Sequence, residues 1–409
     1  MINTSRSTIQ TVWLIIGILL IAANLRASIT AIGPLIGHIR AATGISNTWA
    51  GFLTTLPLLG FAFFSPIAPI IARRFGLERT IGLSLAAIAT GICIRLIPSI
   101  IALFVGTALL GAAIGVVNVL LPGLIKRDYP ERIGMLTGAY SVAMGVFAGL
   151  AAGISIPLAD DAGLGWRGTL FVWLFLAVPA ILVWLPQYKN SLLPLRNAAL
   201  TGGNIWRSRL AWQISLFMGL QSFLFYVAIA WLPQILVDRG SDPETAGWML
   251  FLMQLAGLPA TFLVPVWAGK LADQRGVVAV VIAFSAAGWI GLLLDQKAQW
   301  AWLWVIFIGI ALGAFISLAL AFMGLRTHSA SQAAQLSGMA QSVGYLLAAI
   351  GPTLAGLVHD LTHSWQLPLI ALLFVNLLLL LFGLGAGRNV LMAEERPSHN
   401  QLSQSKYSG

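Results

Sequence analysis

The stretch from Trp13 to Arg40 constrains the fold more than any other, because it carries a charge in the middle of an apolar run. A helix needs roughly 20 apolar residues to cross a bilayer, and this run is long enough. Arg26 lies near its middle, where an arginine costs about 2.5 to 3.5 kcal/mol on insertion scales. No carboxylate occurs within the stretch to pair with it. We therefore predict a membrane protein in which Arg26 forms the positive wall of a polar internal space.

The composition of the whole chain agrees with a membrane protein. Hydrophobic residues make up 58% of it and charged residues 9%, whereas about 25% of an ordinary soluble domain is charged. The net charge of +10 does not indicate a nucleic-acid partner, because the basic residues lie in short loops between apolar runs. The single cysteine, Cys93, excludes a disulfide framework and a cysteine-based metal site. We expect no cofactor and no metal, and the partners are a small-molecule substrate and the lipid bilayer.

The apolar runs predict an all-α polytopic membrane protein with twelve transmembrane helices. Their lengths fit the span of a bilayer. The predicted limits are 11–38, 49–72, 79–97, 100–125, 133–157, 167–186, 210–237, 246–271, 277–294, 300–325, 330–358 and 365–387.

Charge asymmetry predicts the orientation. If the amino terminus and every second loop face the cytoplasm, that side holds seventeen of the 23 lysines and arginines and the other side holds five. Cytoplasmic loops carry such an excess of positive residues. We expect both termini to be cytoplasmic.

The chain repeats itself at an offset near 200 residues. Gly76 returns as Gly276, Asp160 as Asp360, and the run 136–138 (Leu-Thr-Gly) as 336–338 (Leu-Ser-Gly). Such repeats occur in secondary transporters, which bind substrate near the midplane at the repeat interface. The offset pairs Arg26 with Tyr226 and Ser141 with Gln341, and we expect each pair to face across a pseudo-two-fold axis. The predicted units are an N-terminal six-helix half (1–186), a cytoplasmic linker (187–209), a C-terminal six-helix half (210–387) and a disordered cytoplasmic tail (388–409).

Arg26 and a set of polar residues well inside the spans are the predicted substrate-binding residues. For Arg26 the alternative is a structural ion pair, but all thirteen acidic residues fall in loops, tails or span ends. For the others the alternative is bonding between helices, worth on average about 0.6 kcal/mol each. Asn24 lies about 200° around the helix from Arg26, so we expect it to pack elsewhere. The set is Arg26, Asn118, Tyr140, Ser141, Gln221, Tyr226, Gln254, Gln341 and Tyr345.

Small residues predict a close contact between helices in the fifth span. Gly145, Gly149 and Gly153 recur every four residues, a spacing that lets another helix approach. A contact of this kind between the two halves would allow them to rock, and plain close packing is the alternative.

The loop from Gly269 to Gly276 resembles the G-x-L-A-D-R-x-G signature of the major facilitator superfamily. Its glycines allow a tight turn, and its carboxylate suits a neighbouring helix amino terminus. The equivalent loop of the first half places Arg73 where the family has aspartate, so this position lacks the carboxylate that would bind a helix amino terminus. The predicted gating residues are Asp273, Arg275, Gly276, Arg73 and Arg74.

Three further segments resemble the cyanate/2-nitroimidazole transporter family (CynX/NimT), nearest its 2-nitroimidazole exporter branch. They are 118–128 (Asn-Val-Leu-Leu-Pro-Gly-Leu-Ile-Lys-Arg-Asp), 336–347, and Leu25-Arg26 followed by Gly33-Pro34. The resemblance implies an inner-membrane transporter, without enzymatic activity, that moves small polar, anionic or nitro-heteroaromatic molecules as two halves rock. Uptake of a small organic anion by exchange stays open. A lipid-modifying intramembrane enzyme is the rival class, but it would need an acid, base or nucleophile inside the spans.

Two further expectations follow. No Asp, Glu or His falls inside the spans, so we favour a mechanism without a dedicated protonatable switch there. We also expect a monomer.

Overall fold

The computed structural model describes residues 8–129, 133–190, 205–328 and 330–392. Within these residues every regular element is a helix. The order is α1 (Thr8–Thr30), α2 (Ile32–Thr43), α3 (Asn47–Phe64), α4 (Ala68–Phe75), α5 (Leu77–Ile94), α6 (Ile100–Asp128), α7 (Ile133–Ala159), α8 (Gly165–Val172), α9 (Leu174–Trp184), η2 (Leu185–Asn190), η3 (Ile205–Arg207), α10 (Arg209–Val237), α11 (Pro243–Lys270), α12 (Arg275–Leu294), α13 (Ala301–Leu325), α14 (Ala330–Thr362) and α15 (Gln366–Ala386).

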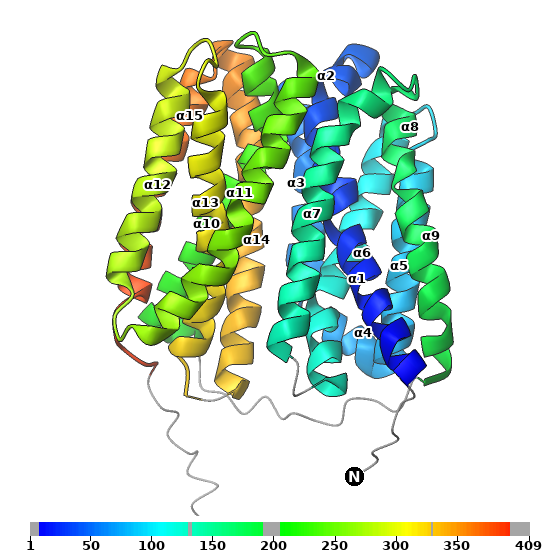
Figure 1. Cartoon of the computed structure of the whole chain (residues 1–409), viewed down its shortest axis with the longest axis vertical. Helices are drawn as coiled ribbons and strands as arrows, with labels where there is room; N and C mark the ends of the chain where they lie inside the picture. The colour runs from blue at the N-terminus through cyan, green and yellow to red at the C-terminus, as the bar shows by residue number, and fades with distance from the viewer. Residues whose placement is uncertain (1–7, 130–132, 191–204, 329, 393–409) are drawn as a thin grey trace, which may run out of the picture.

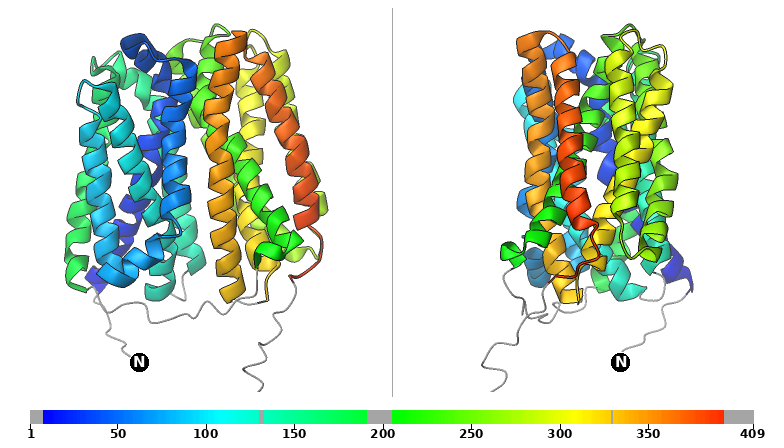
Figure 2. Two further views of the ribbon diagram at one scale, coloured as in Figure 1. Left: turned by 180° about the vertical axis from the view of Figure 1, so that it is seen from behind. Right: turned by 90° about the vertical axis from the view of Figure 1, so that its left-hand side faces the viewer.

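The helices run up and down in two groups, α1–α9 and α10–α15, which stand side by side in Figures 1 and 2. We call these groups the N-terminal half and the C-terminal half. The end at which α1 begins and α15 ends is called the terminal end, at the bottom of Figure 1, and the opposite end is called the far end. The predicted linker falls largely on 191–204, outside the described residues. Part of the predicted tail packs on the C-terminal half, because Met392 is buried and its N–H donates to the Arg326 carbonyl.

The predicted membrane spans are confirmed, with one change of shape. Within the described residues, eleven helical stretches are long and apolar enough to cross a membrane. The pair α3–α4 makes a twelfth if it counts as one span, but it bends by 62°. The predicted span 49–72 therefore corresponds to the bent pair α3–α4. The bend falls next to Pro66, which has no N–H to donate and whose ring crowds the preceding turn.

Helix caps fix where two spans begin at the far end. The Ser46 side chain accepts a hydrogen bond from the Trp49 N–H at the start of α3. At the start of α11, Asp242 accepts from the Thr245 N–H, and Pro243 occupies the first turn, where no N–H is missed. These caps position α3 and α11, each of which contacts a helix of the opposite half.

The two halves touch closely between the middle of the spans and the far end. A Cβ added at Gly51 of α3 would collide with the Pro352 backbone of α14, and one at Gly356 of α14 with the Asn47 carbonyl. Thr55 adds hydrogen bonds from α3 to the Ala349 carbonyl (2.8 Å) and the Thr353 hydroxyl (2.9 Å). A helix without a side chain at the contact lets the partner backbone approach, as in other small-residue membrane interfaces.

The second contact between the halves is the one predicted from the glycines of the fifth span. Cβ atoms at Gly145, Gly149 and Gly153 of α7 would stand within 3 Å of Leu258, Phe251 and Trp248 of α11. The close approach is thus confirmed, and it joins opposite halves. Towards the terminal end the surroundings change, since a Cβ at Gly123 or Gly338 would meet no described atom within 4 Å.

We predict that Gly51→Ala lowers the apparent unfolding temperature of the purified protein, because its methyl group meets backbone that cannot turn aside. Overpacking of this kind typically costs about 1–3 kcal/mol. Gly338→Ala is the matched control, because it lies in a helix and its Cβ would face open space. There we expect an unchanged or slightly higher temperature, since alanine favours helix over glycine. Equal temperatures for the two variants would contradict the close contact at Gly51.

Candidate functional site

Arg26 bonds to the other half of the protein in the middle of the spans. It lies on α1, and its Nη1 donates to the Tyr226 hydroxyl of α10 at 2.5 Å. These are the two residues that the internal repeat pairs. Asn24 turns away, as expected, and its amide donates to the Leu20 and Leu176 carbonyls. Arg26 keeps some exposed surface although it lies deep in the bundle.

Aromatic rings surround the guanidinium. Its central carbon lies 5.6 Å from the Phe225 ring centre and 5.7 Å from that of Tyr226. These distances allow cation–π attraction. Among the described residues no carboxylate pairs with Arg26, so the structural ion pair considered above is not formed. Phe225 was not among the predicted residues, because a phenylalanine in an apolar helix does not differ in sequence from one that faces lipid or core.

Two more tyrosines from opposite halves lie near Arg26. Tyr140 of α7 and Tyr345 of α14 are within range of electrostatic interaction with it. The Tyr345 ring packs edge-on against Phe61 of α3, with ring centres 5.2 Å apart, which is another contact between the halves. Tyr140 also lies close to the side chain of its neighbour Ser141. The predicted tyrosines therefore gather around one cation.

The predicted amide residues divide into two groups. Asn118 keeps partial exposure on α6, and the Nε2 of Gln254 on α11 is buried without a hydrogen-bond partner. Both have donors available for a ligand. Gln221 and Gln341 instead donate within their own helices. Gln221 Nε2 donates to Ser222 and Met218, and Gln341 Nε2 donates to Ser337. The pair Ser141 and Gln341 therefore makes no direct bond comparable to that of Arg26 and Tyr226.

The predicted gating residues lie at the terminal end. Asp273 accepts hydrogen bonds from the Arg275 backbone N–H (2.9 Å) and Nε (2.8 Å), and these bonds hold the pKa of its carboxyl below the usual value. Gly276, Arg73 and Arg74 are exposed there. The helix start expected to receive Asp273, near residues 130–132, lies outside the described residues. An open surface hollow lined by Arg275, Gly276, Arg388 and neighbours lies at this end and is separate from Arg26.

The arrangement suits a small ligand with a negative or strongly dipolar group and a flat body. A guanidinium presents a planar fork that matches two oxygens, and aromatic faces can stack on a ring. Arg26 comes from one half, and Phe225 and Tyr226 come from the other. A ligand bound between them touches both halves.

Comparisons with known proteins agree with this architecture. Residues 14–352 match the Major Facilitator Superfamily. The chain is 46% identical over 390 residues to the 2-nitroimidazole transporter of Escherichia coli (strain K12), covering 95% of this chain and 98% of the relative. It is 26% identical over 349 residues to the cyanate transport protein CynX of the same organism, covering 85% and 90%. A bacterial homologue of the human lysosomal transporter Spinster, solved in an inward-facing and occupied conformation, superposes with a TM-score of 0.78. This superposition has 16% identity and covers 96% of this chain and 100% of that one. The chain therefore belongs to the Major Facilitator Superfamily and, within it, to the family of the cyanate and 2-nitroimidazole transporters.

Proposed function

We propose that this transporter carries small, flat molecules with an anionic, carboxylate or nitro group, and binds them between Arg26 and the rings of Phe225 and Tyr226. The observation that carries the proposal is the hydrogen bond from Arg26 to Tyr226, which joins the two halves at mid-span. Among the described residues no carboxylate pairs with this arginine. The names of its relatives support the substrate class, since they include a 2-nitroimidazole and a cyanate transporter.

The proposed mechanism is alternating access, in which the halves rock about the Arg26 site. Contacts between the halves gather from mid-span to the far end, while Gly123 and Gly338 face open space near the terminal end. This distribution supports a state that opens at the terminal end. A substrate that binds both Arg26 and the aromatic residues of the other half adds attraction between the halves. That attraction helps the site to close around the substrate before the far end opens.

The proposed orientation places the terminal end in the cytoplasm of a bacterial cell, with the protein as a monomer in the inner membrane. The excess of lysine and arginine at the terminal end supports it. The state described above is then inward-open. The relatives named above are transporters, which gives no support to an intramembrane enzyme.

Replacement of Arg26 tests the site. We expect Arg26→Ala and Arg26→Lys to weaken 2-nitroimidazole binding about 10- to 100-fold, because a hydrogen bond to a charged group contributes about 1.5–3 kcal/mol. Lysine retains the charge but loses the planar fork. The measurement is ligand-induced thermal stabilisation of the purified protein, followed by flux in proteoliposomes of equal protein content. Arg79→Lys, at an exposed arginine, is the matched control. Normal flux through Arg26→Ala would exclude the proposed site.

Phe225 tests the aromatic part of the substrate class. We expect Phe225→Leu to weaken binding of a nitro-heteroaromatic about three- to tenfold and to leave cyanate unaffected, because leucine keeps the apolar contact but removes ring stacking. Competition between the two compounds for binding to the same protein measures the ratio of their affinities. Phe223, on the same helix and also half-buried, provides the control Phe223→Leu. An equal loss of affinity for both compounds would show that Phe225 affects the structure of α10 and does not stack on the substrate.

Asp273 tests the proposed latch at the terminal end. In the inward-open state its carboxylate binds Arg275 of its own half, and we expect it to move to the amino terminus of α7 when this end closes. Asp273→Asn retains the shape but loses the charge, so it should increase labelling, from the cytoplasmic side, of a cysteine introduced at the terminal end of a Cys93→Ser chain. Labelling equal to that of the unmodified chain would count against the latch.

A further inference from the structure

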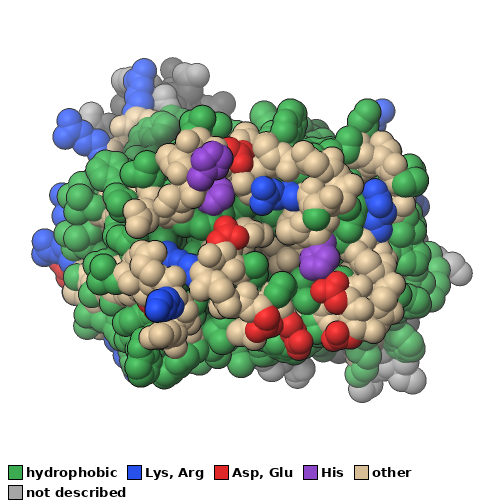
Figure 3. Space-filling view, turned by 90° about the horizontal axis from the view of Figure 1, so that it is seen from above, with side chains coloured by type: hydrophobic (Ala, Val, Ile, Leu, Met, Phe, Trp, Pro, Cys, Tyr) green, Lys and Arg blue, Asp and Glu red, His purple; other side chains and the backbone are tan. Residues whose placement is uncertain are grey.

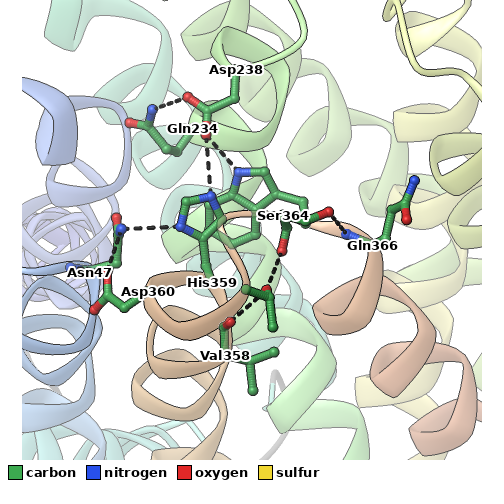
Figure 4. Close-up of polar contacts among 10 residues, drawn as sticks. Asn47, Gln234, Asp238, Val358, His359, Asp360, Ser364 and Gln366 are labelled. Carbon is green, nitrogen blue, oxygen red and sulfur yellow. Dashed lines mark hydrogen bonds and ion pairs between the residues drawn. The ribbon is translucent and has the colours of Figure 1, made fainter.

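A cluster of charged and polar side chains links the two halves at the far end (Figure 4). Asp360 of α14 directs both carboxylate oxygens at the first turn of α3. Oδ1 accepts from the Asn47 backbone N–H (3.1 Å) and side-chain Nδ2 (2.7 Å). Oδ2 accepts from the Thr48 N–H and hydroxyl, both at 2.7 Å. The carboxylate of one half thus caps a helix of the other, where the backbone N–H groups and the helix dipole favour negative charge.

His359 extends this cluster through the same asparagine. Its Nδ1 lies 3.1 Å from the Asn47 Nδ2. Its Nε2 lies 3.8 Å from Asp238 Oδ2, and its ring stacks on Trp365 with centres 4.1 Å apart. The imidazole is half-buried at the far end, so protons can reach it.

The hydrogen bonds assign the protonation state of the imidazole. An ionised carboxylate only accepts, so the amide of Asn47 must turn its nitrogen, not its oxygen, towards Asp360. The second N–H of that nitrogen then points at His359 Nδ1, which must accept it and carry no proton. The closed far end therefore contains a neutral imidazole with its proton on Nε2.

A second proton has no place in this arrangement. If Nδ1 of His359 were protonated, its N–H would face the N–H of Asn47, and two donors repel each other. If the Asn47 amide were reversed, its oxygen would face the carboxylate of Asp360, and two acceptors repel each other. Either change weakens the capping of α3 by α14.

The charges facing His359 come from three elements. Arg40 of α2 and His363, directly after α14, oppose a positive imidazole, whereas Asp238 and Asp360 attract it. Both carboxylates are already engaged. Asp238 accepts from Trp365 Nε1 and Gln234 Nε2, each at 2.7 Å, and Asp360 accepts from four donors of α3.

The repeat supplies an internal comparison. Histidine and carboxylate side chains gather at two separate places on the far end (Figure 3). At the second place, His38 Nε2 lies 3.0 Å from Asp160 Oδ1, and both residues belong to the N-terminal half. His38 and Asp160 are the repeat partners of Asp238 and Asp360. This pair lies within one half and takes no part in the contact between the halves.

We propose that His359 is a proton-binding site that controls closure of the far end: the neutral imidazole holds α3 to α14 through Asn47, and the protonated imidazole releases them. Histidine is the side chain that ordinarily changes its charge within the physiological pH range, which suits an imidazole to such a switch. Acid at the far end then favours opening at that end, with or without substrate.

The test measures a distance between the halves in the full-length protein in lipid nanodiscs, without substrate. Spin labels are placed at the exposed positions of Ala42→Cys in α2 and Leu361→Cys in α14, in a Cys93→Ser chain. From pH 8 to pH 5 we expect the ratio of long to short distances to rise about five- to tenfold, which corresponds to loss of about one hydrogen bond. A label pair within the N-terminal half, Ala42→Cys with Ala162→Cys, should not change.

Variants then identify the group that binds the proton. His359→Gln can still accept from Asn47 but cannot gain a proton, so its distance ratio should stay that of the closed state at both pH values. The matched control His38→Gln should respond to pH like the unmodified chain. Asn47→Ala removes the donor and should also reduce the response, which keeps the test decisive if His359→Gln does not fold. The proposal would be overturned if the distance ratio of the unmodified protein did not change between pH 8 and pH 5, or changed in the opposite direction. An equally large change in His359→Gln would also overturn it.

Discussion

A single cation at the middle of the bilayer constrains this structure more than any other group. Arg26 has no carboxylate partner among the described residues and bonds instead to a phenol of the other half. An unpaired guanidinium in hydrocarbon is costly, so the surrounding helices must supply polar groups and access to water. Tyr226, Tyr140 and Tyr345 supply oxygens without cancelling the charge. The cation therefore remains available to a ligand, and a carboxylate at the same place would have bound it permanently.

Contacts that close a transporter must be specific and also reversible. At the far end, glycines let the backbones of α3 and α14 touch, so the surfaces are complementary without interlocked side chains. Direction and register come from a few polar bonds, those of Thr55 and the carboxylate of Asp360. Each such bond contributes about 0.5–1.5 kcal/mol net, or somewhat more when charged. A few of them can hold one state closed and still be broken by binding of a substrate or a proton.

The sequence was sufficient to predict the spans, the two-fold repeat and the pairing of Arg26 with Tyr226, because hydropathy and chain offset report these directly. It was not sufficient where the direction of a side chain determines which groups that side chain contacts. Gln221 and Gln341 lie inside spans like Gln254, yet they bond within their own helices, and only Gln254 has an unpartnered nitrogen. The role of Phe225 beside Arg26 depends on rotation of α10, which an apolar helix does not reveal. Pro66 could in principle have predicted the 62° bend after α3, but hydropathy alone shows one continuous apolar run across this position.

The departure from two-fold symmetry at the far end explains how one half can control the other. The repeat places histidine or aspartate at equivalent positions, yet His38 and Asp160 pair within a half, whereas Asp360 reaches across to α3 and His359 follows it. A symmetric arrangement would place a titratable bridge on both the α3–α14 and the α7–α11 contacts. Here α7 meets α11 through glycines and apolar side chains, which do not respond to pH. The two contacts can therefore have different tasks: α7–α11 provides a surface on which the halves turn, and α3–α14 provides the bonds that hold one end shut.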